Sequence, residues 1–401
     1  MALAAYHKIT RVLTGRPFGT GSDGALTVSA SATQTQTVES CSGTATQSTL
    51  TIGGAAFTDG DIILIHQSRG TGVGQWEINR VVSGGGTTTL TLQVALQYTY
   101  TDSGASQAQV VKIPQYTTVT IDSGQTWAAP EWAGNTGGIL LFAASVSATI
   151  TGNISANGSG FLGGNPVDAV STANNQGEGA PADRNTNATA ANGNGGGGGY
   201  HDSNVSGGGG GGLGVAGSNG VNGTGGTAGG PGIGGGTDGD TELNDFVFGG
   251  AGGAGAAGGS NGSAGGTGVG GDGGGGVFIF AKALTVTGTI TNDGVAGSNG
   301  NSGANNIASA GGGGGAGGST LIEVQSATLG TNLLDATGGN GGTGGDAAAI
   351  DGGAGGAGGA GRIAVHYGVS ATGSSASPAF VSAEDSTLVA VAGGSFILNL
   401  I

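Results

Sequence analysis

The most chemically equipped short segment of the sequence is Tyr200-His201-Asp202-Ser203, which sets an imidazole, a carboxylate and a hydroxyl side by side. These are the residue types of a nucleophilic triad. A triad needs its three side chains to converge in space, however, and adjacency along the chain does not bring them together. Two interpretations stay open: a plain surface loop, or a recognition loop on a rigid scaffold. We take Tyr200, His201 and Asp202 as candidate receptor-binding residues and predict no catalytic residue.

A second segment gathers carboxylates at Asp238, Asp240, Glu242 and Asp245. Hard cations such as Ca²⁺ prefer oxygen ligands from loops of this kind. The ligand spacing of an EF-hand is missing, and so is the Gly-Gly-x-Gly-x-Asp repeat of calcium-binding β-rolls. The four residues are candidate metal ligands, and the alternative is a solvated acidic turn. We expect no cofactor, with Ca²⁺ as the one ion that this segment could hold.

Two aromatic residues, Phe246 and Phe248, follow the acidic segment directly. They could contact a partner at an exposed tip, or they could fill the scaffold as a buried plug. The plug is the favoured interpretation, because large aromatic side chains contribute most when they are removed from water. Both residues are nevertheless kept as receptor-binding candidates.

Glycan cleavage by paired carboxylates needs two acids about 5 to 9.5 Å apart across a sugar. Acidic residues such as Asp335, Asp346 and Asp351 show no spacing in the sequence that establishes such a pair. A glycan depolymerase is therefore the least favoured of the three functional classes that we consider, and we expect a protein that is not an enzyme.

Charge and cysteine content exclude several partners. The 401-residue chain has 24 acidic and 9 basic residues, a net charge of −15, and its basic residues beyond residue 130 are Arg184, Lys282 and Arg362. A phosphate-binding groove needs clustered Lys and Arg, so nucleic acid is a poor partner. No apolar run is long enough to insert into a membrane, and the single Cys41 excludes an intrachain disulfide. The first residues lack the apolar core of an export signal, from which we expect release by host lysis.

The elements that would position these residues change in character near residue 130. Residues 25–130 contain short runs rich in Val, Ile, Thr and Leu, such as TLTLQVAL, separated by turn clusters. Apolar and polar residues alternate in these runs, as in half-buried antiparallel strands. The pattern predicts a β-barrel or sandwich.

Beyond residue 131 an apolar strand motif recurs, with copies that begin at Gly137, Gly275, Gly317 and Gly359. Each copy has a glycine start, an apolar strand, a short Ala/Ser/Thr step and a second strand, although the last copy is truncated. Strand pairs that recur in this way predict stacked units, each of which buries an apolar face on its neighbours. We expect β-solenoid-like repeats.

Glycine-dense tracts lie between these copies and account for most of the 98 Gly residues. One interpretation is flexible loop, because Gly loses more backbone entropy on ordering than any other residue. The other is a bundle of polyglycine-II helices with three residues per turn, whose amides can bond only to neighbouring chains. Ala, Ser, Asn and Thr are nearly the only residues that interrupt the glycines, which favours the packed bundle.

These tracts, over about residues 190–361, resemble the distal tail-fibre adhesins of T-even-like phages. The resemblance implies polyglycine-II helices packed into a sandwich, with loops at the tip that bind the receptor on the host. The chain departs from that family in its N-terminal β domain and in its repeated apolar strands.

The sequence thus predicts an all-β protein with an N-terminal arm (1–24), a barrel or sandwich attachment domain (25–130), a glycine-rich repeat domain (131–373) and a C-terminal β segment (374–401). We expect a phage virion protein, a tail-fibre or adhesin subunit that binds a glycan or protein on the host surface. Its other expected partners are copies of itself or other virion proteins, and its expected location is the virion, outside the cell after lysis. A self-assembling filament or surface-layer subunit is the first alternative, and a β-solenoid depolymerase is the second.

Overall fold

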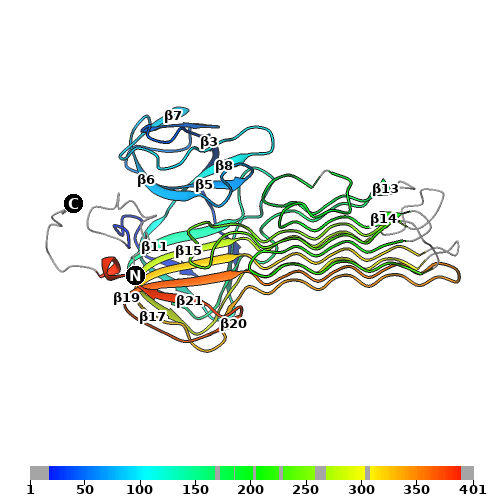
Figure 1. The fold of residues 1–401 in the computed structure, drawn as a ribbon. Coiled ribbons are helices and arrows are strands. Elements are labelled where there is room, and N and C mark those ends of the chain that lie inside the picture. Colours follow the sequence, from blue (N-terminus) through cyan, green and yellow to red (C-terminus); the bar gives the residue numbers. More distant parts are fainter. Residues whose placement is uncertain are drawn as a thin grey trace, which may run out of the picture.

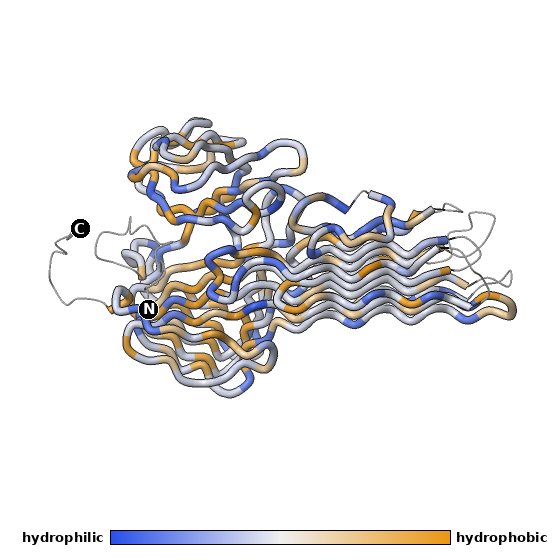
Figure 2. Tube along the Cα trace, viewed as in Figure 1, coloured by the Kyte–Doolittle hydropathy of each residue, from blue (hydrophilic) through white to orange (hydrophobic). Residues whose placement is uncertain are grey.

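The computed structural model describes residues 18–167, 172–184, 186–201, 205–224, 229–257, 268–302 and 308–389. Within these ranges the protein is all-β, as predicted: there is no α-helix, and the one helical turn is the 3₁₀ turn η1 (Ser386–Leu388). Figure 1 shows three parts, which are a barrel, a pair of sheets below it, and a long glycine-rich extension to one side. Apolar residues concentrate in the barrel and the sheets, and the extension has few (Figure 2).

The barrel is a closed ring of six antiparallel strands, which confirms the barrel prediction. Along β5, Ile63 and Ile65 belong to the barrel core, whereas Ile62 and Leu64 pack on the outside. All four are buried because the outer face of this strand is also covered. In ring order the strands are β3 (Val38–Ser42), β4 (Thr49–Ile52), β7 (Thr89–Leu92), β6 (Trp76–Ser83), β5 (Ile62–Arg69) and β8 (Gln107–Lys112).

Two parallel sheets lie below the barrel (Figure 1). The larger has the order β1 (Leu26–Val28), β9 (Gln115–Ile121), β11 (Ile139–Ile150), β15 (Gly276–Val286), β17 (Ser319–Thr328), β19 (Arg362–Thr372) and β21 (Val381–Glu384). The smaller has the order β2 (Ala32–Thr33), β10 (Thr126–Ala128), β12 (Asn153–Ser155), β16 (Thr289–Thr291), β18 (Leu334–Asp335) and β20 (Ser375–Ser377). A separate antiparallel pair joins β13 (Thr172–Ala173) to β14 (Tyr200–His201).

The domain boundaries differ from those predicted. The barrel spans residues 38–112 and is inserted between β2 and β9, so the flanking strands β1, β2, β9 and β10 belong to the parallel sheets. Alternation in β9 looks like that of a barrel strand, but its partner is the parallel strand β11. The strands β20 and β21 likewise join these sheets rather than a separate C-terminal segment. Residues 1–17 and 390–401 lie outside the described residues.

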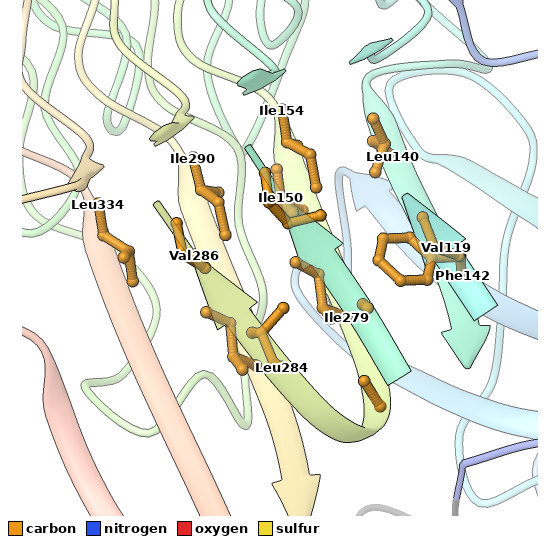
Figure 3. Packing of buried hydrophobic residues seen from close by; sticks show 14 of the residues in the cluster. Val119, Leu140, Phe142, Ile150, Ile154, Ile279, Leu284, Val286, Ile290 and Leu334 are labelled. Carbon is orange, nitrogen blue, oxygen red and sulfur yellow. The ribbon is translucent and has the colours of Figure 1, made fainter. Parts of the chain in front are cut away.

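The core between the two sheets is built from one apolar row per strand. In Figure 3, Ile150 at the end of β11 and Val286 at the end of β15 lie beside Ile154 and Ile290 of the smaller sheet. Register places Ile150 opposite Val286 and Ile154 opposite Ile290, so like side chains stack from strand to strand. Full burial of one such side chain stabilises the fold by about 1.5–3 kcal/mol.

One position of this core carries an amide. Asn292 follows β16 at the level where the neighbouring strands are followed by Ala156 and Ala336. Its side chain is completely buried, and neither its Oδ1 nor its Nδ2 has a hydrogen-bond partner among the described residues. An amide buried in this way costs about 1–3 kcal/mol relative to one that is hydrogen-bonded.

The glycine-rich extension is held by backbone hydrogen bonds with a period of three residues. In the tract 207–212, the amides of Gly207 and Gly210 donate to the tract 218–221. The amides of residues 208 and 211 donate to 311–314, and those of residues 209 and 212 donate to 194–197. The carbonyls accept from three further tracts in the same rotation. The six partners are 194–197, 218–221, 232–235, 250–253, 311–314 and 356–359.

The tract 311–316 has the same environment. Six tracts surround it, and each of the six is also hydrogen-bonded to the next around the ring. In cross-section the extension is therefore a hexagonal array in which every interior tract has six neighbours. The six partners here are 208–211, 250–253, 271–274, 295–298, 339–342 and 353–356.

Residue type follows position in this array. The interior tracts 207–212 and 308–318 are buried throughout and carry little besides Gly and Ala. At the outer tract 338–345, every third residue is buried glycine, and the exposed residues Asn340 and Thr343 fall at one fixed place in each turn. At 214–224, Gly recurs at every third residue and the two positions between are mostly exposed. Side chains are thus confined to the turns' solvent-facing sides.

We expect Gly313→Ala to lower the free energy of unfolding by about 3 kcal/mol or more, because overpacking an interior that cannot yield is costly. A methyl group at this position would overlap the carbonyl oxygen of Gly209. Gly230→Ala is the matched control, since nothing lies within 4 Å of its added methyl group. Urea unfolding of both variants measures the difference, and equal stability of the two would contradict the close packing of the array.

We expect Asn292→Ala to leave the free energy of unfolding unchanged or to raise it by up to about 1 kcal/mol, because the unpartnered amide is removed. The reverse change at the neighbouring strand, Ala336→Asn, should lower it by about 1–3 kcal/mol for the same reason. Chemical denaturation of both variants provides the comparison. A clear loss of stability in Asn292→Ala would show that the amide has a partner in solution.

Candidate functional site

Successive tracts run in opposite directions, so a tract that leaves the sheets is connected at the far end of the extension to the tract that returns. The tract 207–212 is antiparallel to 218–221, and 338–345 is antiparallel to 352–361. We call the end that joins the sheets the root and the opposite end the distal end. Figure 1 places β13 and β14 at the distal end, opposite η1. Side chains at turns of the distal end are the ones that the scaffold presents away from the barrel and the sheets.

Tyr200 and His201 lie at this distal end, in β14. The ring of Tyr200 lies against Gly229, where an added methyl group would collide with it. His201 is buried, with 4% of its surface exposed, and its Nδ1 has no hydrogen-bond partner among the described residues. The third member of this candidate set, Asp202, lies outside the described residues.

A second distal feature is the turn 346–351, which connects two outer tracts. Asp351 organises it, because one carboxylate oxygen accepts from the amide of Ala347 at 2.9 Å and its own amide donates to Thr224 Oγ1 at 3.0 Å. Ile350 packs on a small buried cluster of Val205, Ala256 and Ala310, which closes the array at this end. The exposed surface of the turn includes Asp346 and two alanines. This turn is thus held from beneath and open to solvent.

Phe246 and Phe248 lie at the root and are completely buried. The ring of Phe246 stacks on Phe278 of β15 with centroids 4.0 Å apart, and Phe248 contacts the ring of Trp132. From the barrel side, His66 Nε2 lies 2.7 Å from the carbonyl oxygen of Phe246. The two rings fill the space between barrel and sheet. Their burial confirms the favoured interpretation, a buried plug, and corrects their assignment as receptor-binding candidates.

The acidic segment is also at the root, and it folds around one of its own members. The Asp240 carboxylate accepts from the amides of Glu242 and Asp245 at 2.9 and 2.8 Å and from the amide of Asn244 at 3.1 Å. Asp238 uses its carboxylate on the amide of Gly239. Asp240 is therefore saturated by backbone donors and fixes the turn.

No metal centre follows from this arrangement. Among the residues that the structure describes, no three His, Cys, Asp or Glu side chains gather as a metal ion requires. The carboxylates of Asp238, Asp240 and Glu242 have separate partners, and the four residues with Asp245 form no such group, which corrects their assignment as metal ligands. The segment is instead tied to the sheet: Arg362 Nε donates to the carbonyl oxygen of Asp238 at 3.0 Å, and Glu242 faces His366.

His366 lies between two carboxylates on the face of the larger sheet below the acidic turn. Its Nε2 is 3.3 Å from Glu242 Oε2, and its Nδ1 is 3.6 Å from Glu323 Oε1. Burial of the imidazole disfavours its charged form, but the hydrogen bonds and charges of Glu323 and Glu242 outweigh burial and raise the pKa of His366. The imidazole thus lies between the acidic turn and the sheet, and it joins them by charge when it is protonated.

A buried ion pair fastens the barrel to the base of the extension. Arg69, at the end of β5, donates to Glu178, and the Glu178 side chain is completely buried. The same carboxylate accepts from Trp132 Nε1 at 3.1 Å and from the amide of Leu162 at 2.9 Å. Burial raises the pKa of Glu178, while these donors act in the opposite direction. A buried charge pair needs this number of hydrogen bonds to offset its desolvation.

Sequence reasoning missed the distal residues Thr224 and Ile350 and the root residues Arg69 and Glu178, and it considered Asp351 only as a possible catalytic acid. A usable signal was present for the distal set. Because tracts alternate in direction, every second connection between them must return at the same end, and counting connections separates distal turns from root turns. The buried pair has no such signal, since its members are far apart in the sequence.

Comparison of the chain with protein-family models, with curated proteins and with solved structures found no match. Across the described residues, no helix has the length and apolar character needed to span a membrane.

The contribution of His366 to stability should depend on pH. The folded pKa is raised, so the contribution is fully present below the unfolded pKa of about 6.5 and is lost as pH rises through the folded pKa. We expect the stability difference between the wild-type protein and His366→Gln to be largest at low pH and to shrink as pH rises. Urea unfolding across this range measures it.

The variant Glu242→Gln serves as the control for this experiment, because it removes one of the two carboxylates that raise the pKa of His366. In this background the pKa of His366 should rise less, so the stability difference should change over a narrower pH range. A stability difference that is the same at every pH would contradict a protonated His366 in the folded protein.

Proposed function

We propose that this chain is a non-enzymatic virion protein, a tail-fibre or adhesin subunit of a phage, which binds a receptor on the host surface through the distal turns of its extension. The observation that carries the proposal is the alternation of tract direction, which brings Tyr200, Thr224 and the turn 346–351 to one end of a laterally bonded rod. Loops held on a rigid scaffold are the usual place for binding residues.

Within this proposal the three-residue hydrogen-bond period is that of a polyglycine-II bundle, and the strand pairs at the root are solenoid-like repeats. The resemblance to the T-even-like adhesins supports the same interpretation, since their receptor-binding loops also lie at the tip of such a bundle. The barrel and the sheets, at the opposite end from β13 and β14, would serve for attachment to the virion. The receptor would be a glycan or a protein on the host surface.

A steric block at the distal end tests this proposal without knowledge of the receptor. Ala349 is an exposed residue of the turn 346–351, and Cys41, the chain's single cysteine, is 2% exposed. We expect Ala349→Cys coupled to a polyethylene glycol maleimide to lose binding to host cells by roughly tenfold or more. Flow cytometry of a panel of bacteria with labelled protein measures binding.

The matched control is Val146→Cys, coupled in the same way, because Val146 lies on β11 at the root and is 56% exposed. Its binding should equal that of the wild-type protein. Equal loss in both coupled variants would place the receptor site elsewhere, and failure of the unmodified protein to bind any cell surface would overturn the proposal.

A further inference from the structure

One face of the extension is flat and lacks the neighbours that interior tracts have. The tract 352–361 is bonded on one side to 214–224, where Ser218 and Val221 donate to it, and on the other side to 338–345. Beneath it lie 207–212 and 311–317. Among the residues that the structure describes, it therefore has four of the six neighbours of an interior tract, and Ala357 on its open side is exposed.

The missing neighbours leave backbone groups unused at regular intervals. Among the described residues, the amides of Ala354, Ala357 and Ala360 have no backbone partner, and neither do the carbonyls of Gly352, Gly355 and Gly358. In the adjacent tract the carbonyls of Gly338, Gly341 and Gly344 are unused in the same way. At about 3.1 Å per residue, each row repeats at roughly 9 Å. The face thus offers donors and acceptors in the register of the array itself.

The tracts of this face carry no charge. The chain has a net charge of −15, yet the tracts 214–224, 338–345 and 352–361 contain no charged residue. Two copies that approached through these tracts would not set carboxylates of the tracts against each other, so the tracts themselves add no charge repulsion to the contact. The side chains between the unused groups are also small, and Ala357 at the centre of the face is exposed.

We propose that this face binds a second copy of the chain across a two-fold axis. The unused amide row of 352–361 in each copy donates to the unused carbonyl rows of the other. A two-fold axis makes this contact reciprocal, since each surface supplies the donors and the acceptors that the other lacks. Unpaired backbone rows attract a further chain here as they do at the edge of a β-sheet.

The size of the face sets the strength of the contact. The tract 352–361 is roughly 30 Å long, and three tracts at about 4.8 Å spacing span roughly 15 Å. A face of roughly 450 Å² per copy belongs to the small, reversible class of interfaces. The dimer is therefore concentration-dependent. The inference stands on the array and its charge, and it does not depend on receptor binding at the distal end.

Analytical ultracentrifugation of the full chain tests the proposal. The wild-type protein should shift from monomer to dimer as its concentration rises to about 100 µM. Ala357→Asp sets two carboxylates against each other's surface and should remain monomeric throughout. Val146→Asp carries the same charge on an exposed residue of β11 and should dimerise like the wild-type protein. A monomeric wild-type protein at about 100 µM, or an Ala357→Asp variant that still dimerises, overturns the proposal.

Crosslinking keeps the test decisive if Ala357→Asp unfolds, which circular dichroism would reveal. Ala357→Cys should give a covalent dimer with a short bis-maleimide, whereas Val146→Cys should not, and the buried Cys41 contributes no background. Equal crosslinking of the two cysteine variants, or none in Ala357→Cys, rules out this face as the contact.

Discussion

The structure depends on a backbone that cannot satisfy its own hydrogen bonds. A chain with three residues per turn leaves every amide and carbonyl pointing outward. Inside the extension each of these groups finds a partner only because another tract of the same chain lies within hydrogen-bonding distance on every side, as the six neighbours of 207–212 show. Neighbours at that distance leave no room for side chains, so glycine content is a condition of the packing rather than a sign of disorder. In the extension, backbone hydrogen bonds between tracts take the place of a hydrophobic core as the source of rigidity.

The rest of the molecule meets the cost of starting such an array. Gly loses more conformational freedom on folding than any other residue, so free tracts would not align by themselves. The parallel sheets hold the ends of successive tracts at adjacent positions, because β15, β17 and β19 are paired start to start, with Ser319 opposite both Gly276 and Arg362. Around them, the buried Glu178, the aromatic pair Phe246 and Phe248 and the Asp240 turn join the barrel to this frame. The polar clusters of this chain are thus located where parts join, and this explains why a segment rich in carboxylates is a structural turn.

Sequence patterns predicted the all-β fold and the barrel, because alternation and turn residues are local signals. They did not predict that the barrel is an insertion, since β9 alternates in the same way whether its partner is a barrel strand or β11. The aromatic character of Phe246 favoured a buried plug, which is correct, but Phe246 and Asp240 were also kept as binding candidates because residue type says nothing about which end of the extension a connection occupies. The contact between Asp351 and Thr224 was missed because the two residues lie 127 residues apart in the chain.

The hexagonal array also restricts how the length of a tract can change, because its hydrogen bonds repeat every three residues. Three successive residues of a tract bond to three different neighbouring tracts. One residue inserted in an interior tract would therefore direct every following amide to the wrong neighbouring tract. Three inserted residues would restore the correct partners, provided that a partner tract on each side lengthens by the same amount. Residues 346–349 of the distal turn stand outside this rule, since no backbone hydrogen bond joins them to a neighbouring tract. Such a protein can change its tip residue by residue, but it can change its reach only in whole turns shared by all its tracts.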